Sequence, residues 1–297
     1  MRVVPPLKRS MPEPALTIAS LIRDSCLQEA CGRWLAGGRW RMVWLDPDAN
    51  PVAQLELRRE EFDALVLEEG ALESQAYQAL SDLGLQLPAV VIGAVSGQTE
   101  FHQAEVHLPP DQLEQLSYSL DAAISRVLQR GQGAGAGPPL GQAKPETLEG
   151  WKLANRLKGR LGFVGVFYKR DPSRFLRNLP ELEREELFHS LERTYRDLLL
   201  SYFRDPAAAN QALESFVNTA FFSDLPITKT VEIHVNLIDA FSQRLKLEGH
   251  KNDFLQDYRL ALLDVMAHLC EMYRRSIPPD APLAAIPLQA TGQPTMV

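Results

Sequence analysis

Residues 161–180 read LGFVGVFYKRDPSRFLRNLP and separate two halves of the chain that differ in pattern. Apolar and aromatic side chains crowd the first part of this stretch, so a core or a partner must cover them to prevent aggregation. A basic cluster follows, consisting of Lys169, Arg170, Arg174 and Arg177. Glycines at 159, 162 and 165 would each cost a helix interior about 1 kcal/mol relative to alanine. The stretch is therefore predicted to be a docking element rather than a plain amphipathic helix.

The composition favours a two-domain protein of a reducing compartment. The chain has 297 residues, 45% hydrophobic content and a net charge of −7, which disfavours nucleic acid or an anionic membrane as a partner. The longest apolar runs are far short of the roughly 20 residues that cross a bilayer. No stretch is a convincing secretory signal. Three cysteines without a second spaced pair predict no metal site, and we expect a cytoplasmic protein.

A stretch rich in glycine, alanine and proline divides the chain. Residues 131–145 read GQGAGAGPPLGQAKP and lack any apolar period, which is typical of a flexible linker. We therefore predict an N-terminal domain at 14–130, a linker at 131–146 and a C-terminal helical domain at 147–280. Residues 1–13 and 281–297 are predicted to be disordered tails.

The N-terminal half alternates short apolar runs with amphipathic segments. The runs predicted to be strands are 15–22, 40–45, 62–67, 89–95 and 104–108. The segments predicted to be helices are 23–35, 52–60, 72–83 and 111–128. This alternation predicts an α/β domain with a flavodoxin-like, doubly wound parallel sheet. The order also resembles that of a response-regulator receiver domain.

Receiver chemistry requires acidic residues after the first strand, an aspartate after the third and a lysine after the fifth. Here Asp24 is the one acid just beyond the first strand, and Glu68 occupies the position of the nucleophile. Pro109 follows the fifth strand, with no lysine nearby. Because a glutamate carries one more methylene, its carboxylate would lie off the in-line position. These degenerate positions predict a pseudo-receiver that senses or docks rather than accepting phosphate.

The C-terminal half has the pattern of four helices. Pro180 is predicted to open the first and Pro206 to end it; the second spans 209–222, and Pro226 and Asn252 or Asp253 introduce the last two. Short connections favour an antiparallel four-helix bundle. The last two helices are apolar on more than one face, as Val231, Ile233 and Val235 show. A bundle of this size cannot cover all of these side chains alone, so we predict a homodimer.

Several motifs of this half resemble the C-terminal domain of the KaiA family of cyanobacterial circadian clock proteins. They are FYKRDPSRFLRNLP (167–180), SYF (201–203) with VNTAFF (217–222), TKTVEIH (228–234) and DYRLALLDVMAHLCEMYRRSIP (257–278). The resemblance runs from about residue 153 to 278. The N-terminal half is similar to the pseudo-receiver domain of the family in PAVVIG (88–93), AEVHL (104–108) and the helix within 107–124.

The resemblance implies a regulator without catalysis of its own and without a required cofactor. Members of the family are homodimers that bind the C-terminal peptide of the kinase KaiC and stimulate its autophosphorylation. KaiB bound to phosphorylated KaiC captures them in an inactive form. The pseudo-receiver half of the family is associated with sensing oxidised quinones. The alternative is a phosphorelay protein with a receiver-like domain and a histidine-bearing helical domain.

Seven residues are predicted to line the groove for the KaiC peptide: Leu161, Val164, Phe167, Tyr168, His268, Met272 and Arg275. His268 lies near Met272 and Arg275 by helical spacing, although a hydrogen-bonded core histidine remains the alternative. His234 is expected to be structural. The basic cluster is expected to form internal ion pairs, with Asp171 beside it, and partner binding is the alternative.

Overall fold

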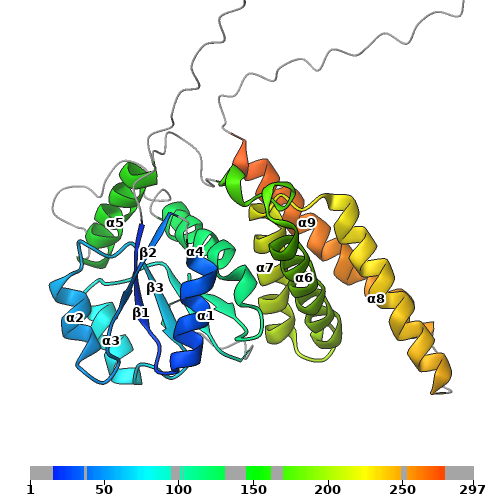
Figure 1. The fold of residues 1–297 in the computed structure, drawn as a ribbon, viewed down its shortest axis with the longest axis horizontal. Coiled ribbons are helices and arrows are strands. Elements are labelled where there is room, and N and C mark those ends of the chain that lie inside the picture. Colours follow the sequence, from blue (N-terminus) through cyan, green and yellow to red (C-terminus); the bar gives the residue numbers. More distant parts are fainter. Residues whose placement is uncertain are drawn as a thin grey trace, which may run out of the picture.

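The computed structural model describes residues 16–36, 39–94, 101–102, 104–130, 145–161, 170–248 and 253–277. Both predicted tails and almost all of the predicted linker lie outside the described residues, and so do Val164, Phe167 and Tyr168 of the predicted groove. Two domains follow one another along the chain (Figure 1).

The N-terminal domain contains a five-stranded sheet. Its strands are β1 (Leu16–Leu21), β2 (Trp40–Trp44), β3 (Ala64–Glu68), β4 (Ala89–Ile92) and β5 (Val106–Leu108). All neighbours pair in parallel, in the order β2-β1-β3-β4-β5. This is the flavodoxin-like strand order, so the predicted α/β fold is confirmed. Strands β1 and β4 are buried along their whole length, as expected where helices cover both faces of a parallel sheet.

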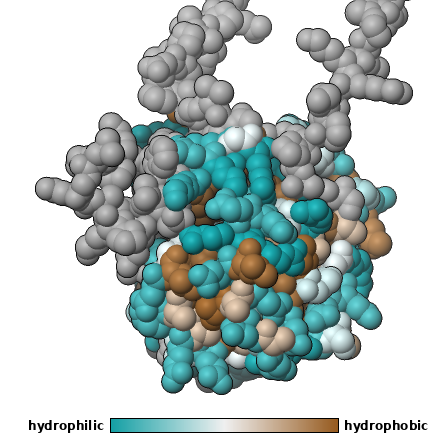
Figure 2. Space-filling view, turned by 90° about the vertical axis from the view of Figure 1, so that its left-hand side faces the viewer, coloured by the Kyte–Doolittle hydropathy of each residue, from teal (hydrophilic) through white to brown (hydrophobic). Residues whose placement is uncertain are grey.

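Helices flank this sheet. They are α1 (Ser25–Leu35), α2 (Pro51–Leu57), α3 (Ser74–Asp82) and α4 (Leu116–Arg130), the last preceded by a 3-10 helix (Leu113–Gln115). Asp24 caps α1 by accepting from the Cys26 backbone N–H at 2.8 Å. In Figure 1, α2 and α3 lie on one side of the strands and α1 and α4 on the other. Figure 2 shows the left-hand side of that view, where hydrophilic residues surround a group of hydrophobic ones.

Helix α5 (Pro145–Leu161) was not predicted from the sequence, and it runs through Gly159. It lies against the N-terminal domain, with Leu153, Leu157 and Leu161 buried. Each buried leucine stabilises the helix by about 1.5–3 kcal/mol, more than the cost of one glycine. Tertiary packing therefore outweighs the local cost of Gly159 in α5.

The C-terminal half is all-helical, as predicted. Two 3-10 helices (Pro172–Arg174 and Leu176–Asn178) lead into α6 (Glu181–Ser201), α7 (Pro206–Phe222) and α8 (Ile227–Leu247), and a 3-10 helix (Asp253–Tyr258) precedes α9 (Arg259–Ser276). Pro206 opens α7 rather than only ending α6, because Asp205 caps the backbone N–H groups of Ala207 and Ala208. Among the described helices, none is long and apolar enough to cross a membrane.

The two halves meet through α4, which packs against α7, and through the 3-10 helix 113–115 before it, which packs against α6. Helices α8 and α9 lie on the other side of α6 and α7, away from the N-terminal domain (Figure 1). Among the described residues, no element covers the outer surface of α8 and α9.

Candidate functional site

The degenerate receiver positions Asp24 and Glu68 do meet at the carboxyl edge of the sheet, between β1 and β3. Glu68 ends β3, and its Oε2 atom accepts hydrogen bonds from the backbone N–H groups of Arg23 at 2.6 Å and Asp24 at 3.2 Å. This edge is the topological switch point of the sheet, where ligands bind in open α/β folds. The carboxylate that replaces the receiver nucleophile therefore holds the loop after β1 in place.

A guanidinium group lies at the same edge. Arg23 donates to the Gly70 carbonyl at 3.0 Å and pairs with Asp48 at 3.2 Å, while the Asp24 carboxylate caps α1. Pro109 follows β5 and offers no amine. Within the described ranges, no group of three or more His, Cys, Asp or Glu side chains is arranged to hold a metal ion. The local groups that a receiver would use for magnesium and phosphate thus contact the protein itself.

The predicted groove residues that the structure describes lie on two helices. Leu161 ends α5 and is buried. On α9, His268 and Arg275 are exposed and Met272 is half-buried; the Nδ1 atom of His268 is 2.8 Å from the Asp264 carbonyl. Arg275 pairs with Glu271 at 2.6 Å. His268 is therefore not a core histidine, and the other groove assignments stay predictions.

Arg170 and Arg177 of the basic cluster form internal ion pairs, as expected, but with Asp224 rather than Asp171, while Lys169 lies outside the described residues. Arg170 and Arg177 both pair with Asp224, at the turn between α7 and α8. The Arg170 guanidinium lies 4.7 Å from the Phe175 ring centroid and 4.9 Å from that of Phe221. These ion pairs and cation–π contacts fix the segment before α6 to the turn between α7 and α8.

Arg174 of the same cluster contacts the N-terminal domain. Its guanidinium lies 4.8 Å from the Tyr118 ring centroid on α4, and the Tyr118 hydroxyl donates to the Arg174 carbonyl at 2.8 Å. Burial raises the pKa of Tyr118 and lowers that of Arg174. The first part of the C-terminal half is thereby fixed to α4.

A polar seam, formed by Gln112, Gln115, Ser190, Thr194 and Thr219, joins the 3-10 helix before α4 to the bundle. The fully buried Gln115 amide donates to Ser190 at 2.9 Å and to Thr194 at 2.7 Å, and it accepts from the Thr219 hydroxyl at 2.7 Å. Thr194 also donates to Gln112 at 2.6 Å. Sequence reasoning missed these residues, although two glutamines beside the apolar stripe of 111–128 were a signal for polar contacts.

The bundle core holds a second polar pair. Tyr195 and His234, both buried, lie with the tyrosine hydroxyl 3.1 Å from Nδ1 of the histidine. Burial lowers the pKa of His234 and raises that of Tyr195. The neutral imidazole therefore accepts a hydrogen bond from the Tyr195 hydroxyl, which keeps its proton, and the expected structural role of His234 fits this contact.

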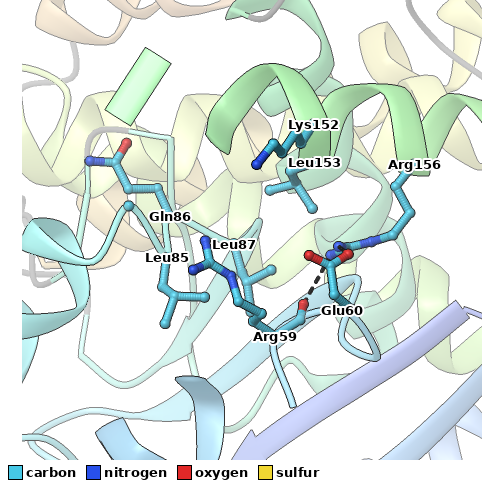
Figure 3. A pocket seen from close by; sticks show the side chains of 9 residues that line it. Arg59, Glu60, Leu85, Gln86, Leu87, Lys152, Leu153 and Arg156 are labelled. Atoms are coloured by element: carbon cyan, nitrogen blue, oxygen red, sulfur yellow. Dashed lines mark hydrogen bonds and ion pairs between the residues drawn. The ribbon is translucent and has the colours of Figure 1, made fainter. Parts of the chain in front are cut away.

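Two pockets lie outside the predicted site. The first separates α5 from the loops after α2 and α3, and in Figure 3 Lys152, Leu153 and Arg156 project from α5 over Arg59 and Glu60. This pocket is the smaller one, with a volume of about 20 Å³. The second pocket, of about 310 Å³, lies between the 3-10 helix 176–178, the turn before α8 and the end of α9.

Family profiles match both halves. The profile described as Circadian clock protein KaiA, N-terminal domain, matches residues 16–131, and that of the KaiA C-terminal domain matches residues 159–280. The circadian clock oscillator protein KaiA of Parasynechococcus marenigrum is 55% identical over 282 residues, covering 93% of this chain and 94% of that protein. The chain belongs to the KaiA family.

Other relatives agree with this membership. The circadian clock oscillator protein KaiA of Synechococcus elongatus is 38% identical over 283 residues, covering 89% of this chain and 98% of that protein. The crystal structure of the C-terminal domain of Thermosynechococcus elongatus BP-1 KaiA is 48% identical, covers 34% of this chain and 95% of that chain, and has a TM-score of 0.31. The predicted resemblance to KaiA is thus confirmed for both halves, and a role as a circadian clock regulator follows. Most of α5 falls between the two profile matches.

Proposed function

We propose that this KaiA-family chain is a non-enzymatic homodimer that binds the C-terminal peptide of the kinase KaiC and stimulates KaiC autophosphorylation. KaiB bound to KaiC would antagonise it, and its site of action would be the cytoplasm. The non-enzymatic part of the proposal rests on the carboxyl edge of the sheet, where a receiver would carry its phosphorylation site. There Glu68 accepts hydrogen bonds from two backbone N–H groups, and Arg23 lies beside it. Family membership supports the choice of partner.

The uncovered face of α8 and α9 supports the homodimer. On α8, Ile227, Val231 and Val235 recur every four residues and are 40%, 37% and 48% exposed. On α9, Leu260 and Leu263 are 48% and 61% exposed. A row of aliphatic side chains at helical spacing is the usual form of a helix–helix interface. Helix α9 also carries three of the predicted peptide contacts, His268, Met272 and Arg275.

The mechanism we propose is a population shift. A dimer that binds one conformation of the KaiC tail more tightly than the other favours that conformation by the difference in binding free energy. No step of this mechanism requires a reacting group on the KaiA-family chain.

The test combines binding with kinase activity. Purified chain is titrated with the KaiC C-terminal peptide, and KaiC phosphorylation is followed with and without the chain. Arg275→Glu on the predicted groove should weaken both readouts, whereas Arg33→Glu on α1 of the N-terminal domain should change neither. Binding of the peptide with unchanged KaiC phosphorylation would show that the activation mechanism is wrong.

The phosphorelay alternative makes a different prediction. If that alternative were right, acetyl phosphate would label Glu68 or His268. We expect no labelling, because the Glu68 carboxylate is hydrogen-bonded and no ATP-binding motif accompanies His268 in the sequence. Sensing of oxidised quinones by the N-terminal half stays a prediction, for which fluorescence of Trp34, Trp40 and Trp44 on quinone addition is the direct check.

A further inference from the structure

The larger of the two pockets lies at one end of the bundle and combines an apolar floor with arginines. Leu176, Leu225, Pro226, Ile227 and Tyr273 supply the apolar lining. The remaining lining residues are Arg177, Arg184 and Asp224. None of the residues predicted for the peptide groove lines this pocket, so it is a separate surface of about 310 Å³.

Arg184 distinguishes this pocket electrostatically. The one acid in the lining, Asp224, already pairs with both Arg170 and Arg177. In the part of the chain that the structure describes, the half-buried side chain of Arg184 makes no hydrogen bond or ion pair. Its guanidinium therefore offers donors in a fixed planar arrangement to a carboxylate that also brings an aliphatic group.

The chain itself contains such a segment close by. Tyr273 lines the pocket, α9 ends at Ser276, and residues 278–297 follow with the sequence PPDAPLAAIPLQATGQPTMV. Asp280 is the one charged side chain in residues 278–297, and Leu283 follows it three residues later. The KaiA C-terminal profile ends at residue 280, so most of this segment lies outside the family match.

The distances and the composition suit binding within one chain. Four extended residues span up to about 14 Å, which brings Asp280 within reach of a pocket that begins one helical turn before Ser276. Five prolines in the segment favour an extended polyproline conformation, which reduces the entropy lost on binding. The tether also raises the effective concentration of the segment at the pocket.

We propose that the segment from Pro278 to Leu288 binds this pocket of its own chain. The Asp280 carboxylate pairs with Arg184, and the Leu283 side chain packs against Leu225 and Ile227. This inference does not depend on the proposed role in KaiC activation. Under this proposal, a segment that lies mostly beyond the family match occupies the pocket at the end of the bundle.

Photo-crosslinking in the full chain tests the proposal. The photoreactive residue p-benzoylphenylalanine replaces Leu283, and peptides crosslinked on irradiation are mapped by mass spectrometry. We expect crosslinks to the peptide that contains Leu225 and Ile227. Arg184→Glu should lower their yield about tenfold, because a charge-assisted hydrogen bond becomes a repulsion. Combining Arg184→Glu with Asp280→Arg should restore the yield.

Two controls make the outcome decisive. Arg196→Glu, an equal charge change on the exposed side of the same helix, should leave the yield unchanged. A restored crosslink yield in the double variant, Arg184→Glu with Asp280→Arg, would rule out misfolding as the cause of the lower yield in Arg184→Glu. The proposal is overturned by crosslinks that map elsewhere or are absent, by a yield insensitive to Arg184→Glu, or by crosslinks found only between isotopically labelled and unlabelled chains.

Discussion

The Tyr195–His234 contact makes the bundle sensitive to acid. Burial lowers the pKa of His234 from its ordinary value of 6.5, so the folded protein binds this proton only at a lower pH than the unfolded chain does. Between those two values the unfolded state holds more protons, and stability therefore rises with pH and is lost as pH falls below about 6.5. Above that range both states are neutral at this position and the contribution is constant.

We therefore expect His234→Gln to flatten the pH dependence of stability. Glutamine keeps an acceptor for the Tyr195 hydroxyl but has no proton to bind. Relative to this variant, the unmodified chain should lose up to about 1.4 kcal/mol of unfolding free energy per pH unit below 6.5. Urea unfolding between pH 7.5 and 5.5 gives the comparison. Parallel curves for the two proteins would contradict the assignment of this histidine.

The polar seam makes a second prediction at the residue scale. Gln115→Leu keeps the volume of the side chain but leaves the hydroxyl groups of Ser190 and Thr219 without their amide partner. We expect a loss of about 1–3 kcal/mol in unfolding free energy, since the site is fully buried. Gln78→Leu, at an exposed position on α3, is the matched control and should change stability by less than about 0.5 kcal/mol. Equal losses in both variants would show that the seam adds nothing specific.

At the scale of elements, the sequence predicted strands and bundle helices but not α5. Strand β4 is apolar along its whole length and β1 along most of it, and this local pattern can be recognised in the sequence without knowing which elements pack against the strand. Helix α5 follows a glycine- and proline-rich segment and contains Gly159, so local propensity disfavours it. Its stability comes from contacts with loop 59–63, which is distant in sequence. The same reasoning explains the seam, because hydrogen bonds from the 3-10 helix 113–115 to α6 and α7 leave no periodic signal in the sequence.

The anchor of α5 on the N-terminal domain can be tested directly. Arg160 pairs with Asp63, a fully buried carboxylate that also accepts from the Thr17 backbone N–H at 2.9 Å. Arg160→Ala removes a partner of a buried charge and should cost up to about 3 kcal/mol. Faster hydrogen exchange of the α5 amides should accompany the loss. Lys158→Ala on the same helix, which lacks such a partner among the described residues, should leave exchange nearly unchanged; equal acceleration in both would refute an anchoring role.

At the scale of the whole molecule, the N-terminal domain lies on one side of α6 and α7, and the exposed apolar row of α8 and α9 lies on the other. The N-terminal domain contacts α6 through the 3-10 helix 113–115 and α7 through α4, on the side away from α8 and α9. An exposed row of aliphatic side chains favours coverage by a partner surface, and a second copy supplies an identical row. The homodimer proposed above thus leaves the domain seam intact in each protomer.

This geometry predicts that one face controls dimerisation. Val231→Asp combined with Val235→Asp would bury two unpaired charges in the interface, and we expect the dissociation constant to rise at least about 100-fold. Sedimentation or light scattering at micromolar concentration should then show a monomer that retains its helical content. Leu57→Asp, which makes the same change at the 86% exposed end of α2, should remain dimeric. A monomeric unmodified chain, or a dimer that persists in the double variant, would move the interface away from α8.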